Sequence, residues 1–518
     1  MLSRWGHTDH KEQNRSMRLE TLRLQNFRGY VLCEFNLHPQ FNLVIGENGS
    51  GKTSFLEAAA VAIGSWLLGF RGHDSRNILE RDVRKILEMV EGRYRELPQY
   101  PVSVEATGQV HIARVGRSES DGDIGYLAAD IVKPNPRVVE VKWKRSIKGV
   151  GGRTTRIDAE KLRKYAEDMA NAVLKQEPSV LPLIRYFGAG RLWESVRDSS
   201  GKALSKHRNK QPVELADDAE ELDKALDDFG RLSEPFYGYR MSVDKRCNPD
   251  DLIRWMRVER RNELDEKNSS PALRLVYESI ETMLPEISSA RYSTKLRTLV
   301  LRYQNGERHT FSELSDGYRN VVAIAADLAI KAAMLNPQLA GKALEMTPGV
   351  VLIDELDLHL HPKWQRRIIA DLRRTFPLIQ FICTTHSPFL IQSLQSSDEL
   401  ILLGETQSTT LASPLRGAES NSEDELTADE LITDDLEHLG IEAIASGIMG
   451  VEADASPKYL AMLQAAREYL AELDNAVHSP AERLELYKQS LAQRLAPYAE
   501  NPAFQAVLEA ERIDKIGR

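Results

Sequence analysis

The chain has 518 residues, of which 42% are hydrophobic and 28% are charged, an ordinary composition for a globular protein of about two to four structural units. Its net charge of −9 excludes a globally basic nucleic-acid binder, although not a local basic patch. No apolar run of about 18 residues occurs, so we expect no membrane-spanning helix.

The first 16 residues lack the apolar core of a secretion signal, and we expect a disordered extension there. The three cysteines, Cys33, Cys247 and Cys383, are odd in number and far apart. This spacing argues against a disulfide framework and a zinc site, and it fits a reducing compartment. We therefore expect a cytoplasmic protein.

The first motif is the glycine-rich segment 46–53, GENGSGKT, which matches the phosphate-binding pattern GxxxxGK[ST]. It lies between a predicted buried strand at 41–45 and a predicted helix at 54–63, the order that the motif requires. Its glycines expose backbone N–H groups to phosphate, Lys52 adds an ammonium, and Thr53 offers a hydroxyl to magnesium. A glycine-rich turn with a chance lysine is the alternative.

The next 260 or so residues are predicted to form an antiparallel lobe, a helical insertion and a hairpin. Sustained heptads are absent, which argues against a long coiled-coil arm. The predicted strands are 101–106, 138–143, 296–303 and 308–311, and the predicted helices are 158–175, 217–229, 250–262 and 272–284.

Two groups of basic residues could contact nucleic acid, although charge runs are more often solvated faces. The first group is predicted to lie in a glycine-containing turn and the second in a mobile loop. They comprise Lys142, Lys144, Arg145, Lys148, Arg153 and Arg156, and Lys202, Lys206, His207, Arg208 and Lys210.

A second phosphate-related motif follows the apolar run 350–353, which is typical of a strand buried on both faces. Asp354 and Glu355 come directly after it, at the end of the strand where ligands of open α/β sheets bind. We expect Asp354 to bind magnesium, directly or through water, and Glu355 to act as general base for the attacking water. The alternative is that both acids cap the following turn.

Two further segments decide the class of nucleotide hydrolase. Segment 314–319, LSDGYR, precedes a predicted helix at 320–335, and segment 381–388, FICTTHSP, is a predicted strand that ends near His386. Alone, the first predicts only a helix cap and the second a structural histidine. In this order, the four motifs resemble those of ABC-type ATPases, which implies that Ser315 and Gly317 bind ATP held by a second copy and that His386 is the switch histidine.

The resemblance extends to smaller groups. Segments 22–29, LRLQNFRG, and 356–362, LDLHLHP, are similar to the OLD/RecF-like branch, and segment 181–193 is similar to the PtuA-type ATPases of Septu and retron-linked anti-phage systems. The implied fold is α/β, an ABC-type P-loop ATPase head with an antiparallel β lobe, a helical insertion and a C-terminal helical tail. The implied units are 1–16, 17–195, 196–290, 291–404, an acidic linker at 405–440 and the tail at 441–518.

The implied cofactors are ATP and Mg²⁺, bound in a head-to-head dimer or higher oligomer. Lys52, Glu355 and His386 are the expected catalytic residues, and Thr53 and Asp354 the expected metal ligands. The expected nucleotide contacts are Arg28, Asn48, Gly49, Ser50, Gly51, Lys52, Thr53, Ser54, Ser315, Gly317 and Asp357.

One feature departs from the ABC pattern, because the segment before Arg191 lacks the glutamine that many members place there. Either Arg191 or the glycine-rich backbone before it takes part of this role, or Glu355 and His386 alone position the water. Arg191 itself lies at the nucleotide or forms a surface ion pair. No nuclease centre is visible either, since His359 and His361 belong to the loop after the paired acids.

The resemblance therefore implies an ATPase that controls a separately encoded HNH nuclease, of the type called PtuB, in anti-phage defence. The alternatives are a RecF-like DNA-repair clamp and a stand-alone ATP-dependent nuclease. Contact with DNA or RNA, including retron nucleic acid, stays open.

Overall fold

The computed structural model describes residues 17–73, 75–90, 93–112, 137–177, 179–192, 236–404, 410–412, 444, 448 and 449. The chain divides into two compact units, Met1–Ile444 and Ala445–Arg518, and all elements below belong to the first. The predicted extension, the helix at 217–229, the second basic group, and nearly all of the linker and tail lie outside the described residues. No helix in the described part is long and apolar enough to cross a membrane.

The described residues form a five-stranded, all-parallel sheet in the order β14-β3-β13-β12-β8. Strands β8, β12 and β13 are buried at every residue, as their continuous apolar sequences predict. The carboxyl ends of parallel strands meet at one edge, which places the residues after β3, β12 and β13 together. The strands are β14 (Leu400–Leu403), β3 (Phe41–Gly46), β13 (Ile379–Thr384), β12 (Gly349–Ile353) and β8 (Leu183–Phe187).

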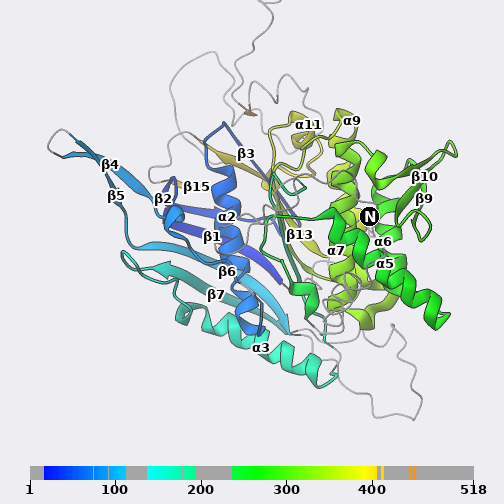
Figure 1. Ribbon diagram of the computed structural model, residues 1–518. Helices are drawn as coiled ribbons and strands as arrows, with labels where there is room; N and C mark the ends of the chain where they lie inside the picture. Colours follow the sequence, from blue (N-terminus) through cyan, green and yellow to red (C-terminus); the bar gives the residue numbers. More distant parts are fainter. Residues whose placement is uncertain are drawn as a thin grey trace, which may run out of the picture. The chain divides into compact units, whose positions relative to one another are not determined.

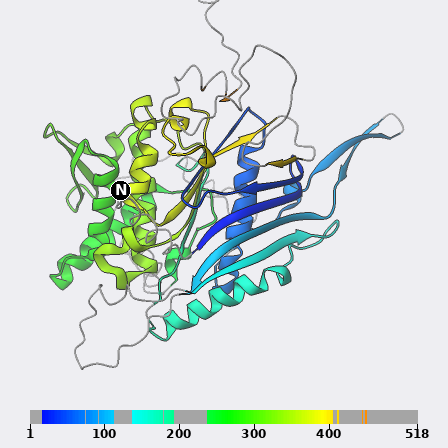
Figure 2. The same cartoon turned by 180° about the vertical axis from the view of Figure 1, so that it is seen from behind.

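A second sheet has the order β15-β2-β1-β6-β7 and is antiparallel except for the pair of β15 and β2. A separate hairpin of β4 and β5 extends beyond it in both views (Figures 1 and 2). The strands are β15 (Thr410–Ala412), β2 (Tyr30–Asn36), β1 (Met17–Phe27), β6 (Val102–Ile112), β7 (Arg137–Ile147), β4 (Lys85–Val90) and β5 (Arg93–Pro98).

Helix α2 (Lys52–Ile63) lies between the two sheets and contacts strands of both. It can do so because its sequence, KTSFLEAAAVAI, is apolar and small on nearly every side, so almost the whole helix is buried. The sheets are also joined by Gln380, whose side chain exchanges two hydrogen bonds of 2.8 Å with the backbone of Leu19. The helix that follows the phosphate-binding loop is therefore fixed inside the core.

Of the remaining helices, α3 contacts β7 of the second sheet, and α5, α6 and α7 pack together on the side of β8. Asn248 and Ser270 cap α5 and α6, each followed by a proline that suits the first helical turn. Both helices contact α7, which also contacts β8, and a meander of β9, β10 and β11 follows α6. The bounds are α3 (Glu160–Leu174), α5 (Pro249–Glu266), α6 (Pro271–Met283), α7 (Asp316–Leu335), α10 (Ile368–Thr375), β9 (Ile287–Ser293), β10 (Thr298–Tyr303) and β11 (Arg308–Thr310).

The predicted strands and helices that fall in the described residues are confirmed, with shifted ends. One placement was wrong: Lys142, Lys144 and Arg145 lie within strand β7 and not in a turn. Because side chains alternate along a strand, Arg145 is fully buried and bound to the Thr155 carbonyl, whereas Lys142 and Lys144 pair with Glu105. Strand β7 thus places Arg145 on its buried face and Lys142 and Lys144 on the opposite face, so these residues do not form one surface patch.

Candidate functional site

The glycine-rich loop connects β3 to α2 in the geometry of a phosphate-binding loop. Gly51 caps α2 with a φ of 100°, in the left-handed region that glycine adopts without strain. A Cβ at Gly46 would lie 2.6 Å from the Leu403 carbonyl, so no larger residue fits there. The Tyr30 hydroxyl donates to the Gly51 carbonyl at 3.1 Å and holds the loop against β2. The N–H groups that open α2 therefore form a ready anion site.

Lys52 turns back over this loop. Its ammonium donates to the carbonyls of Gly46 at 2.6 Å and Glu47 at 2.8 Å. Burial lowers the pKa of Lys52, against the opposing effect of the nearby carboxylates of Asp354 and Glu355. Loop carbonyls thus hold the ammonium at the mouth of the loop, where the β- and γ-phosphates of a nucleotide bind.

The end of β12 faces the start of α2. The Thr53 hydroxyl lies 3.1 Å from Asp354 Oδ2, and the Thr384 hydroxyl donates to Asp354 Oδ1 at 2.7 Å. Asp354 is 4% exposed, so its carboxylate is fixed by neighbours from two other segments. The sheet thereby joins Thr53 and Asp354, which are 301 residues apart in the sequence.

These two residues suit a magnesium ion. No group of three or more His, Cys, Asp or Glu side chains in the described part of the chain could hold a metal by itself. Magnesium at nucleotide sites takes one or two protein carboxylates and completes its octahedron with phosphate oxygens and water. The hydroxyl and carboxylate oxygens of Thr53 and Asp354 fit this requirement.

Glu355 has a strained backbone and an available carboxylate. Its φ is 50°, and the Thr384 hydroxyl accepts a 2.8 Å hydrogen bond from its N–H. Within the described residues, the half-buried carboxylate has no hydrogen bond or ion pair. The backbone is therefore held while the side chain remains available to a water molecule.

The residues after β13 complete this edge. The Thr385 hydroxyl donates to Asp357 at 2.5 Å, and the Ser387 hydroxyl donates to Gln365 at 2.6 Å. His386 lies between these two fixed residues and is exposed. The residues on either side of His386 are thus held by Asp357, in the loop after Glu355, and by Gln365 further along the chain.

Arg191 is buried behind the paired acids and forms no ion pair with any described residue. Its side chain is 1% exposed, and burial lowers its pKa to about 10. The guanidinium donates to the carbonyls of Asp354 at 2.7 Å and Glu355 at 3.1 Å, and to Asn320 Oδ1 of α7 at 2.6 Å. It therefore fixes the backbone of both acids and ties it to helix α7. The surface ion pair considered from the sequence was wrong.

The start of α7 lies beside the loop that follows the acids. A Cβ at Gly317 would approach the His359 carbonyl to 2.5 Å, and the Asn320 side chain donates to the Leu358 carbonyl at 3.1 Å. Ser315 is the N-cap of α7, yet its side chain makes no capping bond. Among the described residues, no hydrogen bond joins Ser315 to the P-loop of the same chain. The structure thus brings Ser315 and Gly317 together with the loop 356–361 and leaves them apart from Lys52.

Arg28 belongs to a buried charge cluster. It donates to Asp82 at 2.9 Å, and Asp82 and Glu57 of α2 are both fully buried and shared with Arg76. Burial opposes ionisation of Glu57, but Arg76 and Lys245 lower its pKa. Arg28 is therefore positioned by carboxylates behind the P-loop helix.

Sequence reasoning missed Thr384, Asn320 and the Glu57 cluster. Thr384 and Thr385 had a visible signal, since two hydroxyl residues end an apolar strand directly before His386. Asn320 and Glu57 had none, because a polar residue in a helix does not reveal which distant segment it contacts.

The fold and this site define a P-loop ATPase. A family model described as an AAA domain matches residues 21–288, more than half of the chain, and the chain belongs to this family. A second AAA-domain model matches residues 204–392.

Individual relatives agree with this class. The chain is 23% identical to "Retron Vc95 probable ATPase" of Vibrio cholerae over 75% of its length and 74% of that protein. It is 25% identical to "Retron Ec83 probable ATPase" of Escherichia coli over 78% of its length and 75% of that protein. It is 42% identical to "Septu protein PtuA" of Bacillus mycoides over 18% of its length and 12% of that protein. These relatives confirm the resemblance to retron- and Septu-type ATPases that the motifs indicate.

Proposed function

We propose that the chain binds and hydrolyses ATP as a head-to-head dimer and controls a separately encoded nuclease in bacterial anti-phage defence. One observation carries the ATP-dependent part. Lys52, Thr53, Asp354 and Glu355 converge at one sheet edge, whereas Ser315 begins a helix with no bond to that edge.

Each group at the edge has a distinct chemical task. The N–H groups of residues 49–53 and the Lys52 ammonium bind the triphosphate, and the ammonium exchanges its carbonyl partners for phosphate oxygens. A magnesium ion held by Thr53 and Asp354 would neutralise charge on the phosphates. Glu355 accepts the proton of the attacking water, and His386 contacts the γ-phosphate.

The proposed dimer completes the site. A helix N-terminus favours an anion, and the start of α7 offers Ser315 and the close-packed Gly317 to such a group. Because neither residue is bonded to its own P-loop, a two-fold dimer would bring each α7 to the nucleotide of the other copy. The loop with Asp357 would then lie at the interface.

The link to defence rests on the retron and Septu names of the relatives and on the sequence resemblance. This resemblance implies a PtuB-like HNH nuclease partner. A RecF-like DNA-repair clamp is the competing function, and proteins named RecF match over about a quarter of the chain, for example 29% identity over 24%.

Phage plating would test the proposal. Cells carrying the gene with its native neighbours should resist phage, and Lys52→Ala should abolish the resistance. The neighbouring gene product should copurify with the ATPase and cut nucleic acid. A chain that hydrolyses ATP but protects no cell and retains no nuclease would favour the RecF-like function.

A further inference from the structure

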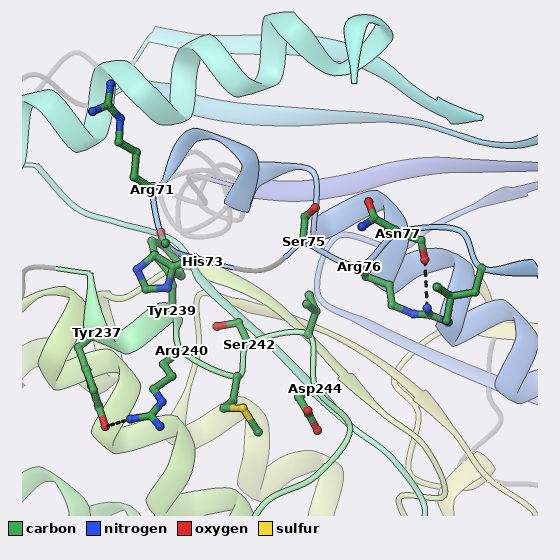
Figure 3. A pocket seen from close by; sticks show the side chains of 14 residues that line it. Arg71, His73, Ser75, Arg76, Asn77, Tyr237, Tyr239, Arg240, Ser242 and Asp244 are labelled. Carbon is green, nitrogen blue, oxygen red and sulfur yellow. Dashed lines mark hydrogen bonds between the residues drawn. The ribbon is translucent and has the colours of Figure 1, made fainter. Parts of the chain in front are cut away.

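A second cavity lies away from the ATP site. It has a volume of about 620 Å³, within the usual range for ligand pockets, and its described lining residues come from segments 71–73, 75–79 and 237–244 (Figure 3). It lies at the far end of α2, since a Cβ at Gly64 would be 3.0 Å from the Arg76 nitrogen and 3.4 Å from Val243 Cγ1. Helix α2 has 12 residues and is about 18 Å long, and the Arg76 side chain reaches from the cavity back to Glu57, five residues after Lys52.

The lining of this cavity is electropositive. Arg71, His73, Arg76 and Arg240 contribute to it, and Asp244 is the sole acid among its described lining residues. The Asp244 carboxylate is already bound by Arg246 at 2.5 and 2.8 Å.

One of these arginines keeps its charge available in the cavity. Arg76 is neutralised by Glu57 and Asp82, and Figure 3 shows the Arg71 side chain pointing away from Arg240 and Ser242. Arg240 forms no ion pair with any described residue, and its guanidinium donates a 2.9 Å hydrogen bond to the Tyr237 hydroxyl. In a chain of net charge −9, such a cavity selects an anionic ligand.

A buried hydroxyl in the lining indicates a hydrogen-bonding ligand. Ser242 is 1% exposed, and its Oγ has no hydrogen-bond partner among the described residues. Figure 3 shows it among the side chains around the cavity, together with Tyr239 and Arg240. Buried hydroxyl groups are nearly always paired, because an unpaired one loses its hydration without compensation.

The wall that carries Ser242 and Arg240 is fixed from behind. The buried Lys331 donates to the carbonyls of Gly238 at 3.1 Å and Arg240 at 2.6 Å. Arg185, 1% exposed, donates to three carbonyls further along the segment, those of Met241 at 2.8 Å, Asp244 at 2.5 Å and Arg246 at 2.6 Å. A wall already held in place loses little entropy when a ligand binds.

We propose that this cavity binds a phosphate monoester of a nucleotide, carried by a free nucleotide or by the 5′ end of a nucleic-acid strand. Arginine matches phosphate because its planar fork donates two parallel hydrogen bonds. The Ser242 hydroxyl donates a further bond. The Arg240 guanidinium lies 5.5 Å from the centre of the Tyr237 ring, and this pair offers a flat surface on which a base stacks.

Titration calorimetry on the full chain carrying Lys52→Ala tests the proposal, because that change disables the P-loop. The probes are AMP, a 5′-phosphorylated oligothymidylate and the same strand with a 5′-hydroxyl. At least one phosphorylated probe should bind, and the 5′-hydroxyl strand should bind more weakly. Preference for AMP identifies a free nucleotide as ligand, and preference for the phosphorylated strand identifies a nucleic-acid end.

Variants locate the binding. In the Lys52→Ala chain, a further Arg240→Ala substitution should weaken the affinity for the phosphorylated probe about tenfold or more, because a charge-assisted hydrogen bond is lost. Ser242→Ala should weaken this affinity severalfold. Arg308→Ala, an exposed arginine on β11 outside the cavity, is the matched control and should leave it unchanged. The unsubstituted chain saturated with a non-hydrolysable ATP analogue provides a second arm that does not depend on the folding of Lys52→Ala. Absence of binding in both arms, or equal binding by Arg240→Ala, would overturn the proposal.

Discussion

The carboxyl edge of the parallel sheet and the start of helix α7 carry the two halves of the ATP-site motifs, but they are built differently. At the sheet edge, Asp354 is held by two hydroxyl groups, and the Glu355 backbone is held by Thr384 and Arg191. At the start of α7, the Ser315 side chain makes no hydrogen bond to any described residue, although the helix N-terminus favours an anion.

This difference supports our proposal that one half of the site is complete within the chain and that the other half would serve a second copy. Arg191 lies between them, since one guanidinium binds the acid backbone and Asn320 in the second turn of α7. If α7 shifted on dimerisation, Arg191 would therefore move with Asn320 and change the position of the Glu355 backbone.

The largest expected effect concerns Glu355. Glu355→Gln should bind ATP normally and lower turnover about 10²- to 10⁴-fold, because an amide of the same shape cannot accept the proton of water. ATP-bound dimers should accumulate, and their mass can be measured by light scattering on a sizing column. Normal turnover in this variant would remove Glu355 from the role of base.

Lys52→Ala should weaken ATP binding about a hundredfold or more, since two charge-assisted hydrogen bonds to phosphate are lost. Titration calorimetry with ATP and magnesium measures this effect. Lys142→Ala, an exposed lysine on β7, is the matched control and should bind ATP as the unsubstituted chain does. Equal affinities for both variants would contradict the assigned role of the loop.

Arg191→Ala tests the connection between the two halves. Three carbonyls and the Asn320 side chain lose their donor, so the free energy of unfolding should fall by about 2–3 kcal/mol in a urea titration. Turnover should fall about tenfold beyond any change in ATP affinity, because Glu355 is less well positioned. Arg191→Lys should recover stability better than turnover, since lysine keeps the charge without the planar fork. Parallel recovery of both would indicate a structural role alone.

Lys331 tests whether the body of α7 is fixed while its start is open. Burial lowers the pKa of Lys331 to about 8 from an ordinary 10.5, against the opposing effect of Asp327. Between these values the unfolded chain holds a proton that the folded chain has released, so this residue raises the free energy of unfolding as pH increases. Relative to Lys331→Met, the unsubstituted chain should gain about 2 kcal/mol from pH 8 to 10.5. Parallel stability curves would show that Lys331 is not buried as described.

Local sequence was sufficient for the strand, loop and helix around Lys52 and for the acids after β12, because a motif and its flanking apolar runs lie within about 20 residues. It could not place Arg191, whose four partners lie directly after β8, directly after β12 and in α7, and meet only in the folded protein. The basic group of β7 was misplaced for a related reason. Alternation along a strand decides whether an arginine is a surface charge or, like Arg145, a buried support.

Mixing two inactive variants tests the shared ATP site most directly. Lys52→Ala lacks the ammonium, and Ser315→Arg blocks the start of α7, so each alone should hydrolyse almost no ATP. A heterodimer of the two contains one site with an intact Lys52 from one copy and an intact Ser315 from the other. An equal mixture should therefore recover about a quarter of the unsubstituted rate, because half of the dimers have one of their two sites intact. No recovery, with heterodimers present by light scattering, would contradict a site built from two copies.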